Sequence, residues 1–378
     1  MAEKKEDDIF SQFPGEIVRR TILKQWEKDE IIEYINGEVF GQGGFSICYK
    51  CINNTKEIFI LKEFKIERNQ KRFCDELEIH RYLEHPNIVK LNNGFEYEEK
   101  FYLLLEYCEN KDLSYILKKR KKLKEIEVIY YITNLIEALK YLHRKKLVHR
   151  DIKLSNIFLT DKLEVKLGDL GLSKKLIEGK LYKMNGTLNY MVPEIFEGDG
   201  YSFEVDIWLI GIIIYQLILG QYPFYDEDKD KKIMKGELKF PGDAIISNAA
   251  KDLIKQILVK YSKRRPTLNQ ILQHEFFKLG RAIPKLLPVI FKDKEPSISY
   301  IKNFMPDADD NGIVNREVIY TKLNQKKILK PKNKKNLDIN IYITKCFINS
   351  EKNNNYELIY VLSNNYLGFF LMIIRKYY

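Results

Sequence analysis

The sequence has few of the features that mark secreted or membrane-spanning proteins. Five cysteines are few for 378 residues, so we expect reduced thiols, as in the cytosol or nucleus. No apolar run reaches the roughly 18 residues of a bilayer span, and the acidic stretch Glu3 to Asp8 is unlike a signal peptide. The nearest approach, Leu358 to Ile374, is interrupted at Ser363 to Asn365. That pattern favours a strand hairpin, with a tail anchor as the alternative.

Apolar and basic residues, in contrast, are plentiful. With 45% hydrophobic residues, the chain can bury a core of about 250 residues and leave an appendage. The net charge is +11, and the densest basic cluster is Lys118 to Lys124. This cluster lies between two helical patterns without interleaved aromatics, which favours a solvated inter-helix face. Docking of acidic partners and nuclear import remain alternatives, whereas we expect no nucleic-acid partner.

The segment from His149 to Asn156 carries polar groups at a spacing suited to phosphate chemistry. Asp151 can orient and deprotonate a hydroxyl, Lys153 can neutralise a transferring phosphate, and Asn156 can hold Mg²⁺. This spacing is typical of a protein-kinase catalytic loop. A polar loop that matches by chance is the simpler alternative, and the further motifs at the expected distances argue against it.

A second carboxylate follows in Asp169-Leu170-Gly171, thirteen residues after Asn156. The apolar run Val165 to Leu167 predicts a short strand that presents Asp169 at its end. Mg²⁺ between phosphates requires hard oxygen ligands, and one carboxylate plus one amide oxygen suits it. We therefore expect Asp169 and Asn156 to be metal ligands. Val192 to Glu194 follows where a kinase activation segment would end.

A glycine-rich turn separates two apolar segments, Tyr34 to Phe40 and Ile47 to Ile52, which predict a strand and its returning partner. Glycine lets backbone amides approach phosphate oxygens, although Ser46 replaces the usual third glycine and a plain hairpin turn is the alternative. Lys62 ends the predicted strand Ile58 to Leu61 and is the expected phosphate lysine, with a solvated strand-end lysine as the simpler reading. The nucleotide-binding candidates here are Gly41, Gln42, Gly43, Gly44, Phe45, Cys48 and Lys62.

The stretch from Lys71 to Glu84 has apolar residues at helical spacing. Such a helix should supply a carboxylate to Lys62. Glu76 is the first candidate and Glu78 the second, and only one can face Lys62 because they point about 200° apart. The gap of 14 residues between Lys62 and Glu76 implies a short connecting loop.

Together these motifs resemble those of a polo-like Ser/Thr protein kinase. The resemblance covers about residues 34 to 290. It rests on the stretches Gly41 to Tyr49, Glu76 to Arg81, Gly186 to Tyr190, Ser202 to Trp208, Arg265 to Thr267, His274 to Phe277 and Ile283 to Pro288.

The resemblance implies an α+β, bilobal protein-kinase fold, with a small antiparallel β lobe that carries one helix and a larger, mainly α-helical lobe. It implies ATP in the cleft, with Leu105 at the back of the pocket, Glu106 to Cys108 as the hinge and Asp112 at the ribose. Lys153 implies Ser/Thr hydroxyls of proteins as acceptors, acidic proteins among them, and ATP and Mg²⁺ as cofactors. The family also implies cell-cycle or microtubule-organising roles in the cytoplasm, in the nucleus or at microtubule-organising centres.

Other positions imply structural roles or depart from the family pattern. Arg265 should pair with Glu194, and Asp206 should hold the backbone of the catalytic loop. Ile60 narrows the adenine pocket, and Leu170 replaces a phenylalanine of similar volume. The remaining departures are Val192, in place of alanine, and Lys183, which takes the position of the activating threonine.

The predicted organisation is an N-terminal extension (1–33), a kinase domain (34–277), a linker (278–340) that is Lys/Asn-rich in its second half, and a partial polo-box-like segment (341–378). This last segment resembles the opening strands of a first polo box, with Cys346 where the family has its phosphopeptide-binding tryptophan. We therefore expect a β-rich fragment without phosphopeptide binding, and self-association through its strands as an alternative role.

Two further alternatives concern activity and regulation. Asp307 to Gly312 matches the first half of an EF-hand loop, but position twelve is Val318, so an Asx-rich turn is favoured over a calcium site. An active phosphotransferase is favoured over a catalytically silent scaffold, because every charged group needed for transfer is present. A calcium-regulated kinase is the lesser alternative.

Overall fold

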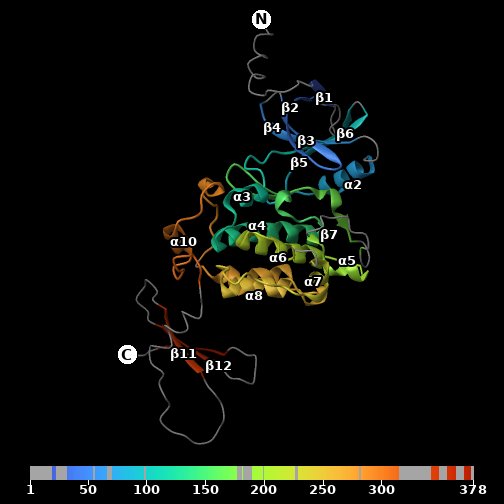
Figure 1. Ribbon diagram of the computed structural model, residues 1–378. Coiled ribbons are helices and arrows are strands. Elements are labelled where there is room, and N and C mark those ends of the chain that lie inside the picture. The colour runs from blue at the N-terminus through green and yellow to red at the C-terminus, as the bar shows by residue number, and fades with distance from the viewer. Residues whose placement is uncertain are drawn as a thin grey trace, which may run out of the picture. The chain divides into compact units, whose positions relative to one another are not determined.

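The chain divides into two units, Met1–Glu317 and Val318–Tyr378, in the computed structural model (Figure 1). The structure describes residues 19–22, 32–53, 56–65, 70–97, 99–176, 181, 190–198, 200–225, 229–280, 282–314, 342–348, 356–362 and 370–375. Among these residues, Cys48, Cys51, Cys74 and Cys108 are free thiols, as the low cysteine content predicts.

The small lobe of the first unit is a sheet in which all neighbouring strands are antiparallel. Its strand order is β1-β2-β3-β4-β6-β5 (Figure 1). The predicted strands on either side of the glycine turn and before Lys62 are confirmed. The strands are β1 (Arg19–Ile22), β2 (Ile32–Gln42), β3 (Ser46–Asn53), β4 (Ile58–Phe64), β5 (Leu91–Tyr97) and β6 (Lys100–Glu106).

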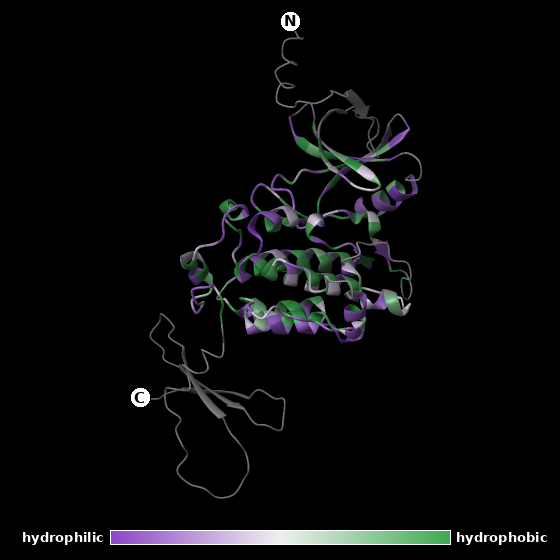
Figure 2. Cartoon of the chain, viewed as in Figure 1, coloured by the Kyte–Doolittle hydropathy of each residue, from purple (hydrophilic) through white to green (hydrophobic). Residues whose placement is uncertain are grey.

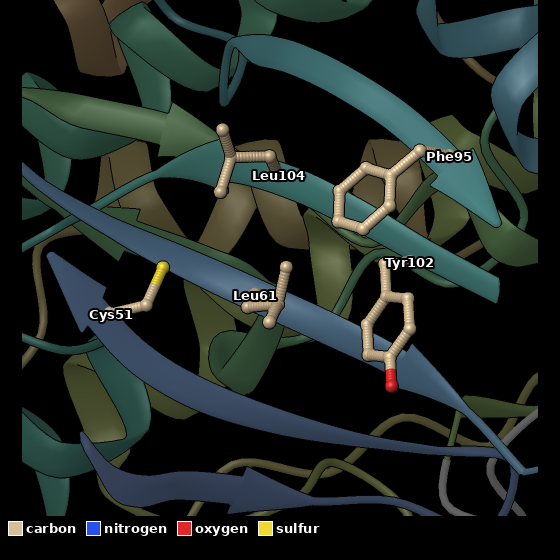
Figure 3. Packing of buried hydrophobic residues seen from close by; sticks show 5 residues of the cluster. All are labelled: Cys51, Leu61, Phe95, Tyr102 and Leu104. Atoms are coloured by element: carbon tan, nitrogen blue, oxygen red, sulfur yellow. The ribbon is translucent and has the colours of Figure 1, made fainter. Parts of the chain in front are cut away.

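The two faces of this sheet bury different apolar clusters, because successive side chains of a strand point to opposite faces. One face carries the cluster in Figure 3, formed by Cys51, Leu61, Phe95, Tyr102 and Leu104. The other face packs Phe64 and Leu103 against Phe73 and Leu77 of helix α2 (Gln70–His80). Lys62 is opposite Leu103 in the register, so it lies on the face that α2 covers.

Helix α2 ends at His80, four residues before the predicted end at Glu84. The His80 ring nitrogen Nε2 lies 2.7 Å from the carbonyl oxygen of Val89, and the Leu83 amide donates to the carbonyl of His80. A buried ring anchored in this way turns the chain toward β5 and terminates the helix.

The larger lobe is mainly helical and is built around the apolar helices α4 (Glu125–Arg144) and α6 (Glu204–Leu219). Helix α6 is buried along nearly its whole length, as expected for a helix that is apolar on every side. Figure 2 shows this hydrophobic centre with more polar helices around it. The other helices are α3 (Leu113–Arg120), α5 (Pro193–Glu197), α7 (Lys229–Lys235), α8 (Asn248–Ile257) and α9 (Leu268–Gln273).

Two short antiparallel strand pairs lie between the helices and flank the predicted site loops. Strand β8 (Ile157–Leu159) pairs with β9 (Val165–Leu167), and β7 (Leu147–Val148) pairs with β10 (Lys174–Lys175). Strand β9 is the predicted strand before Asp169. The predicted bilobal α+β fold is therefore confirmed.

The first part of the predicted linker is packed onto the kinase lobe. Residues 282–314 contain helix α10 (Ile298–Phe304) and a 3₁₀ turn at Val289–Lys292, and they bury Phe291, Ile301 and Met305. The prediction of a linker over 278–340 therefore does not hold for this part, because its apolar side chains have a surface to cover.

The prediction that the basic cluster Lys118 to Lys124 forms a solvated face is also partly wrong. The side chain of Arg120 is 4% exposed and pairs with the buried Glu127. Lys119 contacts Asp293, and Lys124 Nζ lies 3.4 Å from Glu295 Oε2. These basic residues receive partners from the segment that was predicted to be a linker.

The segment Asp307 to Gly312 is the expected Asx-type turn. The Asp309 carboxylate accepts hydrogen bonds from the backbone amides of Asn311 and Ile313, each at 2.9 Å. Gly312 has φ +80°, a conformation that favours glycine. Within the described part of the chain, no cluster of three or more His, Cys, Asp or Glu side chains could hold a metal ion.

The second unit contains three antiparallel strands, β11 (Tyr342–Ile348), β12 (Tyr356–Leu362) and β13 (Phe370–Arg375), in that order. Leu358 pairs with Ile373, which confirms the strand hairpin predicted over Leu358 to Ile374. Among the residues that the structure describes, no helix has both the length and the apolar character of a membrane span.

Candidate active site

A buried ion pair joins the small-lobe sheet to helix α2. The Lys62 ammonium donates to both oxygens of Glu76 at 2.9 Å, and Glu76 is 2% exposed. Glu78 is exposed, so the first of the two predicted carboxylates is the one that faces Lys62. The short connection from Lys62 to α2 is thus compatible with the predicted contact.

Asp169 is the second carboxylate on Lys62. Its Oδ1 lies 3.0 Å from Lys62 Nζ, and the side chain keeps 42% of its surface exposed. The Lys62 ammonium lowers the pKa of Asp169 to about 2, although burial opposes this. Burial would lower the pKa of Lys62, but Asp169 and Glu76 together raise it. Asp169 and Lys62 are therefore ionised near neutral pH. Burial raises the pKa of Glu76, and Lys62 opposes this rise.

The backbone of Asp169 is held in the left-handed region, with φ 57° and ψ 73°. A non-glycine residue adopts this conformation at a cost of about 1–3 kcal/mol, and such strain is common at functional sites. The next residue but one is Gly171, where an added Cβ would lie 2.9 Å from Glu76 Oε2. A side chain at position 171 would therefore disturb the Lys62–Glu76 pair.

The predicted catalytic loop brings its three polar groups together. Asp151 Oδ2 accepts from Lys153 Nζ at 2.7 Å and from Asn156 Nδ2 at 3.0 Å. Asn156 Nδ2 also donates to the carbonyl of Asp151 at 2.8 Å. Because the amide nitrogen of Asn156 is committed to Asp151, its oxygen is the atom suited to a metal ion.

Asp206, at the start of α6, holds the backbone of this loop as predicted. Its carboxylate accepts from the amides of His149 and Arg150 at 3.0 and 2.9 Å and lies 2.9 Å from His143 Nε2. Arg150 has φ 71°, so these bonds stabilise a conformation that arginine rarely adopts. Burial opposes ionisation of Asp206, but the hydrogen bonds from His143 and the loop lower its pKa.

A cavity of about 610 Å³ lies between the glycine turn and the catalytic loop. Its lining contains most of the predicted phosphate-side residues and also five that were not among the predicted site residues. The predicted lining residues are Gly43, Gly44, Phe45, Lys62, Glu76, Asp151, Lys153 and Asp169, and the additional ones are Ser46, Phe64, Arg72, Gly171 and Leu172. Gly41, Gln42, Cys48, Leu105, Glu106, Cys108, Asp112 and Asn156 are not part of its lining.

Arg72 is the most polar of the residues that sequence reasoning missed. Its guanidinium lies 3.7 Å from the ring centre of Phe45, at the tip of the glycine turn. The spacing of Arg72 and Glu76, four residues apart on one helix, could have suggested that both face the cleft. The turn is also fixed by Lys65, whose Nζ donates to the carbonyl of Gly43 at 3.0 Å.

The predicted adenine-side residues lie at the end of β6 and just after it. Leu105 is paired with Ile60 of β4, and Cys108 is buried. The Glu106 side chain is engaged elsewhere, with Oε1 2.8 Å from Lys166 Nζ. Asp112 caps helix α3 by accepting from the Tyr115 amide at 3.0 Å.

Comparison with known families decides what this arrangement is. The family described as "Protein kinase domain" matches residues 34–277. The chain belongs to the protein kinase family. Members of this family use ATP and Mg²⁺ in general and act on protein substrates.

Within this family the kinase is similar to polo-like members. It is 42% identical to the serine/threonine-protein kinase polo of Drosophila melanogaster over 260 residues, or 66% of this chain and 45% of that protein. It is 40% identical to the probable serine/threonine-protein kinase PLK of Dictyostelium discoideum over 314 residues, 80% of this chain and 32% of that protein. It is 35% identical to the cell cycle serine/threonine-protein kinase CDC5/MSD2 of Saccharomyces cerevisiae over 295 residues, 75% and 41% of the two chains. The kinase thus spans less than half the length of these relatives.

The end of the activation segment of this kinase has the predicted ion pair. Arg265 donates to both oxygens of Glu194 at 2.6 and 2.8 Å, and both residues are buried. Earlier in the same segment, Leu181 exchanges backbone hydrogen bonds with Tyr201. The Tyr201 hydroxyl accepts a hydrogen bond from Arg150 Nη1 at 2.8 Å. Lys183 lies outside the described residues.

Proposed function

We propose that the chain is an ATP- and Mg²⁺-dependent protein serine/threonine kinase of the polo-like type. The observation that carries the proposal is the complete set of charged groups for phosphoryl transfer, connected by short contacts. Lys62 contacts Glu76 and Asp169, and Asp151 contacts Lys153 and Asn156. A catalytically silent scaffold is not supported, because none of these groups is lost or turned away.

Asp169 and Asn156 are the residues that would hold Mg²⁺. They offer a carboxylate and an amide oxygen, which are the hard donors this ion prefers. Asp169 is ionised at neutral pH because its pKa is about 2, and its side chain is 42% exposed. When bound, Mg²⁺ neutralises negative charge on the phosphates.

Asp151 and Lys153 are the residues assigned to the acceptor hydroxyl. The Asp151 carboxylate would orient the Ser or Thr hydroxyl and accept its proton, while the hydroxyl oxygen bonds to the γ-phosphorus and ADP leaves. Lys153 Nζ donates to that carboxylate at 2.7 Å and so holds it in position. The Lys153 ammonium would also offset charge that develops on the transferred group.

The nucleotide would lie along the wall formed by the glycine turn and the hinge. Lys62 would contact the α- and β-phosphates, held in place by Glu76, which also anchors helix α2. The backbone of Glu106 to Cys108 would meet adenine, Leu105 would close the back of the pocket, and Asp112 would contact the ribose. The amide of Gly44 in the turn would approach the phosphates, whereas the Gly43 amide donates to the carbonyl of Ser46 at 2.9 Å.

The proposed substrates are proteins with acidic residues around the acceptor. Two basic residues, Arg72 and Lys153, line the cavity together with Lys62, so a negatively charged segment near the cleft is favoured electrostatically. A cell-cycle role in the cytoplasm, nucleus or microtubule-organising centre is proposed from the similarity to polo-like kinases, one of which is named as a cell cycle kinase.

For the second unit we propose a fragment of a polo-box-like sheet that does not bind phosphopeptides. Three strands of this sheet are described, and Cys346 stands where the family has its anchoring tryptophan. Strands can also pair with a strand of another chain, so self-association is the proposed alternative role.

The test is transfer of the γ-phosphate from ATP-Mg²⁺ to a casein-like acidic protein by the full chain. Asp151→Asn should reduce the rate at least about 10³-fold, because it removes the group that receives the hydroxyl proton. Asp243→Asn makes the same change at an exposed position remote from the cavity and should leave the rate unchanged. Absence of transfer by the wild-type chain, or equal rates for wild type and Asp151→Asn, would overturn the proposal.

A further inference from the structure

Residues 282–314, which follow the matched kinase domain and form a C-terminal extension of it, contact helix α3 at both ends. Before the helix, Lys292 Nζ donates to Asn110 Oδ1 at 2.9 Å. At its last residue, Arg120 NH1 donates to the carbonyl of Phe291 at 2.6 Å. Lys119, one position earlier, contacts Asp293. The three consecutive residues 291–293 therefore contact both ends of the eight-residue helix α3, which begins a few residues after the proposed hinge.

Asn110 lies before helix α3, on the side of the proposed hinge, and each polar atom of its side chain has a hydrogen-bond partner. It is 7% exposed, and its Nδ2 donates to the carbonyls of Thr160 and Asp161 at 2.7 and 3.0 Å. Its backbone amide donates to the carbonyl of Leu159 at 3.0 Å. With Nδ2 occupied, Lys292 supplies the hydrogen bond to the amide oxygen, so the orientation of Asn110 depends on the extension.

The loop between Cys108 and Asp112 is short and strained, so its conformation depends on the hydrogen bonds that hold it. Lys111 has φ 60°, and its amide donates to the carbonyl of Cys108 at 3.3 Å. The carbonyl of Lys111 accepts from the Leu159 amide at 2.9 Å. A displacement of Asn110 would therefore be transmitted to Cys108 on one side and to Asp112 on the other.

The extension itself is rigid enough to act as a support. Phe291 is buried, and its ring meets Tyr300 edge to face at 4.8 Å. Ile301 and Met305 are fully buried. Arg120 donates to the Phe291 carbonyl and also forms an ion pair with Glu127, and the two side chains have almost no exposed surface. Lys292 thus reaches Asn110 from a packed element.

We propose that Lys292 is a positioning residue for the nucleotide, acting through Asn110 on the loop that joins the hinge to Asp112. This inference rests on the proposed function, since it assigns a determinant of ATP affinity to that site. It places the determinant outside residues 34–277, in a part of the chain that the kinase family description does not cover.

The test compares Lys292→Met with wild type in the full chain. We expect the KM for ATP to rise about three- to tenfold, which is less than the direct effect of losing one charged hydrogen bond because Lys292 acts through Asn110, with kcat within about twofold. The KM for the protein substrate should not change. Lys292→Arg, which keeps a cationic donor, should restore most of the ATP affinity.

A matched control is Lys302→Met on the same extension. Lys302 is exposed, and its ammonium is 3.7 Å from the exposed Asp310, so its loss should leave both constants unchanged. Thermal unfolding of all variants shows whether they are folded. Calorimetric titration with ATP-Mg²⁺ gives the affinity without requiring transfer.

The outcomes separate this inference from the proposed function. If wild type transfers phosphate but Lys292→Met binds ATP as tightly as wild type, the inference is overturned and the function stands. If Lys292→Met lowers kcat, the affinity for the protein substrate and the unfolding temperature together, the contact is purely structural. That result would also overturn the inference. If wild type binds ATP but transfers nothing, the proposed function fails while the titration still decides the inference. A wild-type chain without ATP binding would refute both.

Discussion

Replacing Asp169 with asparagine should separate catalysis from stability in this protein. Lys62 keeps both of its 2.9 Å contacts to Glu76 in the variant, so its buried ammonium stays paired. The lost Lys62–Asp169 contact involves a carboxylate that is 42% exposed, and such pairs contribute about 0–1 kcal/mol. We therefore expect the unfolding temperature to fall by no more than about 4 °C.

The effect of Asp169→Asn on transfer should be far larger. The variant removes the only carboxylate of the proposed metal pair, and loss of such electrostatic stabilisation should lower kcat at least about 10³-fold. That factor corresponds to about 4 kcal/mol of transition-state stabilisation. Initial rates at saturating Mg²⁺ measure it, with Asp243→Asn as the surface control. Activity within tenfold of wild type, in a folded variant, would refute the metal assignment.

The pH dependence of stability gives an independent check on Asp169. Its pKa is lowered from 3.8 to about 2 in the folded state, so the ionised form is favoured by folding. The stability that it contributes is complete above about pH 4 and is lost as the pH falls toward 2. Denaturant unfolding should thus show a small difference between wild type and Asp169→Asn at pH 6 that shrinks at pH 3. A difference that grows at acidic pH would contradict the assigned ion pair.

Three further outcomes are expected. Glu76→Gln leaves Asp169 as the only carboxylate paired with the buried Lys62. Urea unfolding should show a free energy of unfolding lower by about 2 kcal/mol, and initial rates should show kcat lower by at least about 10²-fold. Unchanged stability would contradict the ion-pair argument. Phosphatase treatment should leave activity unchanged unless the neighbouring Tyr182 is phosphorylated, because Lys183 cannot accept phosphate by the Ser/Thr route. A phosphatase-sensitive loss that persists in Tyr182→Phe would mean that the regulatory site lies elsewhere. Residues 318–378 should confer no phosphopeptide affinity when the full chain is compared with its 1–317 fragment, and micromolar, phosphate-dependent binding by the full chain alone would refute this.

The positions of the charged site groups could be predicted from the sequence because local geometry fixes them. In the catalytic loop, Asp151, Lys153 and Asn156 are close in the chain, and a single turn brings them together. Helical geometry allows only one of Glu76 and Glu78 to face the sheet, but it does not by itself decide between them. The structure decides for Glu76, because Glu78 is exposed. For Lys62, the alternation of side chains along β4 determines the face that it shares with α2.

The extension could not be predicted, because its contacts join distant parts of the chain. Arg120 lies in a dense basic run, and charge density alone favours a solvated face. Its partner in the extension, the carbonyl of Phe291, is 171 positions away, and a backbone group leaves no mark in the sequence. Ile298, Ile301 and Met305 have helical spacing, but such a short helix gives only a weak signal, and the spacing does not show which surface the helix covers.

Arg72 was missed for a different reason. In sequence it is one of several charged residues at the start of a helix, where solvent exposure is the usual expectation. Its position over Phe45 depends on how the glycine turn folds back toward α2, which is a tertiary contact.

The contacts of Asp206 have a consequence for how the protein opens. One buried carboxylate ties α6, the most apolar helix, to His143 of α4 and to the amides of His149 and Arg150. The loop that carries the catalytic groups therefore cannot detach unless a buried carboxylate loses its partners in the interior. Hydrogen exchange at these two amides should follow global rather than local opening. The catalytic loop should therefore stay as rigid as the core beneath it while substrates enter and leave the cleft.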